Sequence, residues 1–414
     1  MRQPRSRSTR PARRAPSPTV PASLLLACVI LASCERAGQE LPGYARARVD
    51  TIGGVEHVIS GARGPWMRRG AWQVGDPVLE IGELDGPEER TFGVVAGVAL
   101  GSGGEVFVAD GQALEIRVFD EDGAFLRRFG RDGEGPGEFR DISGIGFAPD
   151  GTLAVVDGRL SRVSFLRPDG EYVRSFRLER PYLQLVRRDV WFDDEGRFYD
   201  RVQLAGTPGV DSLAVMVYAP GGDVRNTLLV SVHEPDMVTL VRDGVPIMSM
   251  RVPYAPRPTV TVGPDGRVYA TDADRYRIAV LRPTGDTIRV LERSLDPPTA
   301  TPAERADAEA WIRERMRDAG GSPPARIELP DEKAVISRLH ADATGHLWVR
   351  VPMGPGWTRT EYGIFAPDGR YLGALSMPPL VVHSITADRV AGVAVDSLGV
   401  QRVVVLPISK PTGR

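Results

Sequence analysis

The chain has 414 residues, of which 42% are hydrophobic, 46 are glycine and 35 are proline, and it contains no long run of charge. This composition is typical of a globular, turn-rich protein that is long enough to bury a large core. Without residues 1–33, which hold six arginines and no acid, 46 basic residues face 54 acidic ones, a net charge of −8. So acidic a chain has no electrostatic reason to bind nucleic acid or anionic lipid.

Residues 1–33 have the pattern of an export signal. An arginine-rich start precedes the apolar stretch 22–32, which is shorter than the roughly 20 residues that a transmembrane helix needs. The segment ends in Leu-Ala-Ser followed by Cys34, which resembles a bacterial lipobox. This resemblance implies that Cys34 carries a lipid and anchors an extracytoplasmic protein in the cell envelope, with the outer membrane or periplasm favoured.

Two alternatives to the lipobox are open. An ordinary signal peptide would also explain residues 1–33, with an incidental cysteine after it, and the pair Arg13-Arg14 raises twin-arginine export. Cys28 and Cys34 are the only cysteines in the sequence, so the exported protein has no disulfide. Residues 34–72 show no steady period, and we expect them to be a flexible tether for the globular region 73–410.

Two consecutive stretches of this region, 92–130 and 141–178, are nearly the same. Aligning Gly104 with Gly151 gives a period of 47 residues, and each unit has four short apolar runs between Asp-Gly or Gly-rich turns. Alternating apolar residues between such turns predict strands joined in hairpins. A repeat of this length with four strands is typical of a propeller blade, which must stack against copies of itself to bury both faces.

The repeat resembles that of six-bladed β-propellers with NHL-like repeats. The motifs that carry the resemblance are 106–110, 116–120, 122–125 and the glycine-rich connection 130–139. The resemblance implies a ring of six four-stranded blades. Similar propellers include lyases and lactonases, whose active residues and metal lie at one mouth of the channel.

Further units follow in chain order. We expect a third blade over 185–232, a fourth over 259–291, a fifth from about 335 and a last unit of only three strands over 381–408. The isolated strand 77–82 is expected to complete the last unit and close the ring, which removes exposed strand edges.

Two insertions interrupt the blades. Residues 236–254 predict an extra hairpin, and residues 296–332 predict one short helix with an N-cap threonine at Thr301, proline at the first helical position and a capping box with Glu304. The helix is expected to lie on the rim of the propeller, and a partner-binding helix is the alternative.

Candidate catalytic and metal-binding residues are few. The histidines outside the export signal are His57, His233, His340, His346 and His383. They form no His-x-x-x-His or similar pair, so we expect no metal and no cofactor. The run Asp120–Gly123 resembles part of a calcium loop, but a tight turn explains it better. We assign no catalytic residue, since no nucleophile elbow, P-loop or Cys/His pair occurs.

Charged residues stand where the chain enters the innermost strands. The candidate channel-lining residues are Arg140, Asp141, Arg187, Asp189 and His340. A charged channel would suit a polar small molecule or a peptide, and surface salt bridges are the alternative account.

The sequence therefore predicts an all-β, six-bladed propeller of four-stranded blades with one short helical insertion. We expect a monomer, anchored to the membrane through its N-terminal lipid, that acts as a binding or scaffold module for a protein or a small polar ligand. The insertions are the expected partner contact. The alternative function is a lyase-like or lactonase-like enzyme with its active site at the channel mouth, because the fold alone does not decide between them.

Overall fold

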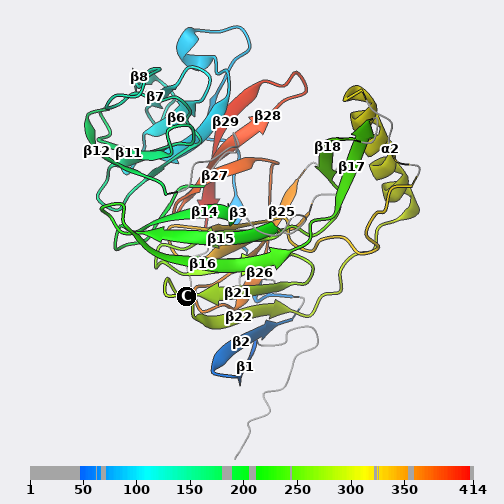
Figure 1. Ribbon diagram of the computed structural model, residues 1–414. Coiled ribbons are helices and arrows are strands. Elements are labelled where there is room, and N and C mark those ends of the chain that lie inside the picture. Colours follow the sequence, from blue (N-terminus) through cyan, green and yellow to red (C-terminus); the bar gives the residue numbers. More distant parts are fainter. Residues whose placement is uncertain are drawn as a thin grey trace, which may run out of the picture. The chain divides into compact units, whose positions relative to one another are not determined.

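The computed structural model describes residues 47–61, 63–66, 71–179, 189–204, 211–242, 245–320, 324, 326–352 and 359–410. Most of the strands form consecutive four-stranded antiparallel sheets (Figure 1). The first three sheets are β5 (Val95–Leu100), β6 (Val106–Asp110), β7 (Glu115–Phe119) and β8 (Phe125–Phe129); β9 (Gly144–Phe147), β10 (Leu153–Asp157), β11 (Arg162–Leu166) and β12 (Tyr172–Arg177); and β13 (Trp191–Phe192), β14 (Phe198–Leu204), β15 (Asp211–Tyr218) and β16 (Val224–His233). Each is one blade.

The remaining blades follow the same plan. They are β19 (Thr259–Val262), β20 (Val268–Thr271), β21 (Arg277–Leu281) and β22 (Thr287–Arg293); β23 (Arg338–Ala341), β24 (Leu347–Arg350), β25 (Thr360–Phe365) and β26 (Tyr371–Met377); and β27 (Val381–Ile385), β28 (Arg389–Val395), β29 (Gln401–Ser409) and β4 (Leu79–Ile81). A glycine at positive φ occupies the turn between the first two strands of five blades, where a side chain would be strained. These glycines are Gly104, Gly151, Gly196, Gly266 and Gly345.

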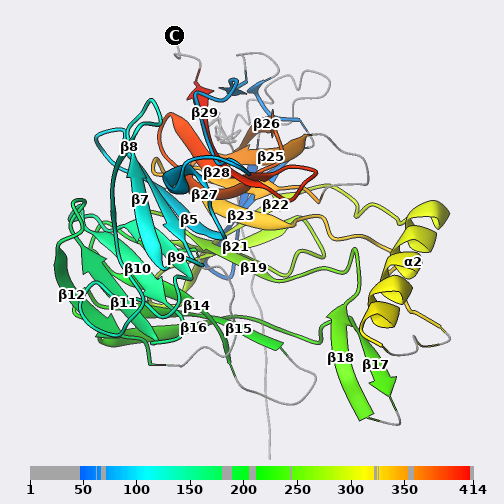
Figure 2. The same ribbon diagram turned by 90° about the horizontal axis from the view of Figure 1, so that it is seen from above.

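The hydrophobic core lies between neighbouring blades. Six clusters of buried apolar side chains each join residues of two successive blades, and one of them joins the last blade to the first. First strands also contact each other, β5 with β9, β13 with β19, β19 with β23 and β27 with β5, and thus surround the centre in Figure 2. The chain is therefore a six-bladed β-propeller, as the repeat predicted.

The ring closes through the strand expected to do so. β4 pairs antiparallel with β29, and Ile81 lies opposite Val403. Leu79 and Ile81 are buried in the cluster between the last and first blades, whereas Val78 is 56% exposed. A short strand, β3 (Gln73–Val74), pairs with the far end of β29. The closing blade thus joins both ends of the propeller region.

The expected flexible tether over 34–72 is wrong for residues 48–60. β1 (Arg48–Ile52) and β2 (Val55–Ser60) form a hairpin, and β2 pairs in parallel with β22 at the outer edge of the fourth blade. Val58 is 2% exposed and packs between the fourth and fifth blades. The sequence of this segment shows no clear period of apolar residues. The reason is that β2 contacts the propeller through one edge only and buries few of its side chains.

The two insertions form one lobe. β17 (Met237–Arg242) and β18 (Val245–Arg251) make the expected hairpin, and α2 (Pro302–Asp318) begins at Thr301 with the expected capping box. Buried Ile312 and Met316 of the helix share a cluster with Val238 and Leu240 of the hairpin. Figure 2 shows these elements side by side. The apolar stripe of the helix is therefore covered by the other insertion.

Candidate functional site

An ion pair links the third and fifth blades inside the ring. Nη2 of Arg338, on β23, lies 2.7 Å from both carboxylate oxygens of Asp189, which precedes β13. The fourth blade stands between these two blades, so a direct contact between them crosses the interior of the ring. The Arg338 and Asp189 side chains are 36% and 23% exposed, so solvent reaches the pair.

Charged residues in these blades replace apolar residues of the repeat. Four positions after the turn glycine, other blades carry buried Val108, Val155, Ala270 and Val349, whereas the third blade carries buried Asp200. The next position holds Ala109, Val156, Arg201, Thr271 and Arg350 in the same blade order. Because polar groups cost free energy at a core position, such breaks in a repeat point to a site rather than to packing. Our sequence analysis missed Asp200, Arg201, Arg338 and Arg350, although this comparison between blades would have found three of them.

The short first strand of the third blade does not extend along this cluster. β13 has two residues and pairs only with Phe198 and Tyr199 of β14. Within the described part of the chain, residues 200–204 of β14 have a strand neighbour on one side only, which is β15. Asp200 and Arg201 thus lie where the innermost strand has ended.

The pKa values of Asp189 and Asp200, two aspartates of the third blade, are shifted in opposite directions. Burial opposes the charge on Asp189, but the positive charges of Arg338 and Arg201 hold its pKa below the usual range. Burial raises the pKa of the Asp200 carboxyl well above its usual range, and Arg201 only partly opposes this rise. Asp189 is therefore the ionised partner of Arg338, whereas the environment of Asp200 favours the neutral acid.

His340 and Tyr362 complete the fifth blade's part of the cluster. Burial, together with the charges of Arg338 and Arg350, lowers the pKa of His340 to about 3 against the opposing charge of Asp189, so the imidazole is neutral at physiological pH. The rings of His340 and Tyr362 lie 6.2 Å apart. Burial raises the pKa of Tyr362 to about 12 against the opposing charges of Arg350 and Arg338. The Tyr362 hydroxyl is buried and has no hydrogen-bond partner among the residues that the structure describes.

The sixth blade contributes His383. The pairing of β27 with β28 shifts register between Val382 and Ser384, which leaves His383 as the extra residue of a β-bulge. Bulges redirect side chains and are frequent beside functional sites. His383 also acts on the pKa of His340, so the two imidazoles are near each other. We call the whole set the axial cluster: Asp189, Asp200, Arg201, Arg338, His340, Arg350, Tyr362 and His383.

The structure separates the candidate channel-lining residues. Asp189 and His340 belong to the axial cluster. Arg140 instead forms exposed ion pairs with Asp132 and Glu134 of its own loop, the surface salt bridges that were the alternative. The Asp141 carboxylate accepts a hydrogen bond from Ser143 Oγ in the same loop. Arg187 and the proposed lipidation site Cys34 lie outside the described residues.

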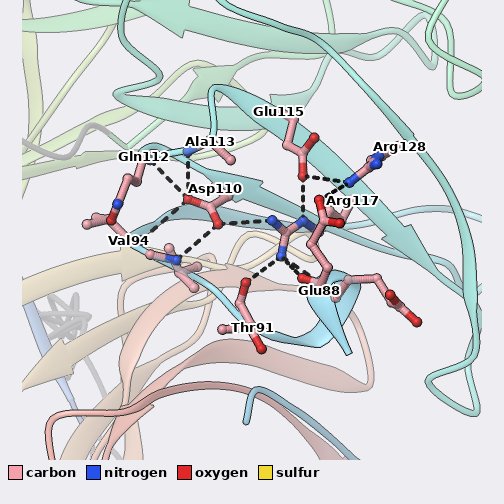
Figure 3. A network of polar contacts seen from close by, with 12 residues as sticks. Glu88, Thr91, Val94, Asp110, Gln112, Ala113, Glu115, Arg117 and Arg128 are labelled. Atoms are coloured by element: carbon pink, nitrogen blue, oxygen red, sulfur yellow. Dashed lines mark hydrogen bonds and ion pairs between the residues drawn. The ribbon is translucent and has the colours of Figure 1, made fainter. Parts of the chain in front are cut away.

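Other charged residues of the repeat have a structural role, as Figure 3 shows for the first blade. The Asp110 carboxylate accepts hydrogen bonds from the backbone of Val94, Gln112 and Ala113. Arg117 is 3% exposed, lies 3.4 Å from Asp110 and donates to the backbone carbonyl of Thr91. The network fixes the segment that leads from the closing strand into the first blade.

The structure also bears on the calcium and metal candidates. The carboxylate of Asp120 accepts hydrogen bonds from the backbone of Asp122 and Ala124, which is the expected tight turn. Over the described ranges, no group of three or more His, Cys, Asp or Glu side chains is placed to hold a metal ion. In the same ranges, no helix has the length and apolar character needed to cross a membrane.

A cleft outside the ring is lined in part by arginines that already have partners. It lies between β8 of the first blade and two turns of the second blade, and its lining includes Arg127 and Arg167. Arg127 already pairs with Glu105 and donates to the carbonyl of Pro168, and Arg167 pairs with Glu171. The axial cluster is therefore the stronger candidate site.

One comparison with known proteins agrees with the fold. Residues 84–178, which contain the first two blades, match a family described as a 6-bladed beta-propeller. No curated protein matches the chain in sequence. Similar solved structures include a putative exported protein from Bacteroides fragilis (11% identity, TM-score 0.48, 86% of this chain and 100% of that chain) and a protein from Bacteroides vulgatus (11%, 0.45, 83% and 100%). A virginiamycin B lyase from Staphylococcus aureus is also similar (11%, 0.36, 81% and 99%). Likenesses of this strength carry no argument about activity.

Proposed function

We propose that this chain is a lipid-anchored, extracytoplasmic binding module whose ring of NHL-like repeats takes a small polar ligand at the axial cluster. The observation that carries the proposal is the solvent-reached ion pair of Asp189 and Arg338 inside the ring. An ion pair that solvent reaches contributes only about 0–1 kcal/mol of net stability. The pair therefore calls for a functional explanation, and ligand binding supplies one.

Binding is favoured over catalysis by the state of His340. A general base works best when its pKa lies near the operating pH. The pKa of His340 is lowered to about 3 by burial and by neighbouring arginines, so its imidazole is a weak base. As a neutral ring it is suited to donating or accepting a hydrogen bond.

The anchor follows from the N-terminal sequence. The arginine-rich start, the short apolar stretch and Cys34 support lipidation and residence in the cell envelope. A full-length Cys34→Ala variant should lose acylation and the membrane retention that depends on it, as measured by lipid labelling and carbonate washing. Unchanged membrane retention would contradict the lipid anchor but would not bear on the proposed ligand binding.

Ligand binding is tested with the soluble Cys34→Ala protein. A library of small polar compounds is screened for an increase in melting temperature, because a ligand that binds only the folded state stabilises it. The double variant Asp189→Leu, Arg338→Met removes both charges together, which avoids leaving one of them without its partner. Every true ligand should lose its effect in this variant and keep it in the matched control Arg140→Gln. Ligands that still stabilise the double variant would show that the site lies elsewhere.

A further inference from the structure

We propose that the outer edge of the third blade, strand β16, binds an extended segment of a protein partner by strand addition. The segment would lie along β16 as a fifth strand of this blade, with apolar side chains at alternate positions and no net negative charge. This inference is independent of the axial cluster and of the ligand proposed there. It follows from the length, composition and exposure of β16, and from the way in which the chain covers the equivalent edge of the fourth blade.

Strand β16 is long for an outermost strand. It has ten residues, whereas the outermost strands β8 and β12 of the first and second blades have five and six. It is the last strand of its sheet, and β15 is its only strand partner among the described residues (Figure 1). An unpaired edge presents a row of backbone N–H and C=O groups to which another strand can bind.

The composition of β16 does not protect this edge. Proteins commonly guard such edges with charged residues, with proline or by keeping the strand short, and β8 and β12 each carry two arginines. From Asn226 to Val232, β16 carries no charged residue and no proline. Leu229 and Val232 are instead 55% and 59% exposed. The edge is therefore long, uncharged and apolar, a combination that favours pairing with another chain.

The chain covers the outer edge of the neighbouring blade with a strand of its own. β2 pairs in parallel with β22, from Glu56 beside Arg289 to Ser60 beside Arg293, and buries Val58. Strand addition at an outer edge is thus compatible with this propeller and removes apolar surface from water. β16 presents the same kind of edge, and the part of the chain that the structure describes supplies no strand for it.

A separate protein fits this edge better than a second copy of the chain. The pairing of β16 with β15 shifts register twice, which leaves Arg225 and Val230 as bulge residues that bend the strand. A flexible peptide can follow a bent edge, whereas a second rigid β16 would have to match both bulges. Two copies would each carry a net charge of −8 and repel each other. The same charge disfavours an acidic peptide.

The experiment selects peptides on the immobilised Cys34→Ala protein from a phage-displayed library of random peptides, each of about twelve residues, enough to span the edge. Enriched peptides should carry apolar, β-branched residues at alternate positions and no net negative charge. Fluorescein-labelled synthetic copies are then titrated by fluorescence anisotropy. The double variant Leu229→Lys, Val232→Lys should weaken their binding at least about tenfold, because it removes apolar contacts and places charges on the edge.

A matched control and a chemical variant of the peptide keep the test independent of folding. Val173→Lys changes a 44% exposed valine on β12 and should leave binding unchanged. In an added strand, the N–H groups of every second residue face the neighbouring strand. Methylating the backbone nitrogens of one alternate set should therefore abolish binding to the original protein, whereas methylating the other set should preserve most of it.

Four results would overturn the proposal. Equal effects of the two methylated sets would exclude strand addition. A selection without enriched peptides, or peptides that bind the double variant as tightly as the original protein, would exclude the site on β16. A dimer of the original protein that dissociates in the double variant would assign the edge to a second copy of the chain rather than to a separate partner.

Discussion

Removing the buried side chains of the closing strand should destabilise the whole ring. Leu79 and Ile81 are 7% and 0% exposed in the cluster between the last and first blades, and β4 is the outer partner of β29. Replacing a buried leucine or isoleucine by alanine costs about 2–5 kcal/mol. The double variant Leu79→Ala, Ile81→Ala should then lose about 4–10 kcal/mol, although two neighbours in one cluster need not add. Typical domains have a total of about 5–15 kcal/mol.

Val78 supplies the matched control. It is next to the closing strand but 56% exposed, so Val78→Ala should change the free energy of unfolding by about 0.5 kcal/mol or less. Guanidinium unfolding followed by tryptophan fluorescence measures both variants. The double variant should unfold at much lower denaturant or accumulate as aggregate, because an unpaired edge of β29 is a template for association. Equal midpoints for the double variant and Val78→Ala would refute closure by β4.

Three further predictions concern other parts of the ring. Deleting residues 47–60 from the full chain should lower the melting temperature, because it removes buried Val58 and uncovers the edge of β22; an unchanged melting curve would show that the hairpin is dispensable. Arg117→Met should lower the free energy of unfolding, measured in urea, by about 3–5 kcal/mol, because it leaves buried Asp110 without its charged partner. Loss of Arg128 from its exposed pair with Glu88 should change this free energy little. The pKa of His340 is about 3 in the folded chain and about 6.5 when unfolded. The folded state therefore binds fewer protons, and its stability should fall as the pH is lowered from 6.5 towards 3; a His340→Gln variant that loses as much over this range would contradict that assignment.

The third blade explains why the site is hard to recognise from one sequence. Its turn glycine and strands follow the repeat, so the blade is predictable. In the sequence, Asp200 and Arg201 are charged exceptions within a variable repeat. The residues beside them in the chain do not indicate which side chains they contact in the folded protein. Their meaning depends on Arg338 and Arg350, which are supplied by a different blade.

Local sequence determined the blades, the turns, the extra hairpin and the capped helix, because these depend on residues a few positions apart. The closing strand was also predictable, since a last unit with three strands lacks one partner. Tertiary structure decided the rest. Asp189 and Arg338 are 149 residues apart in the chain and meet only when the ring brings the third and fifth blades together. The hairpin at 48–60 and the lobe formed by both insertions depend in the same way on contacts between distant segments. Such contacts leave no periodic signal, because each is made once in the folded chain and not once in every repeat.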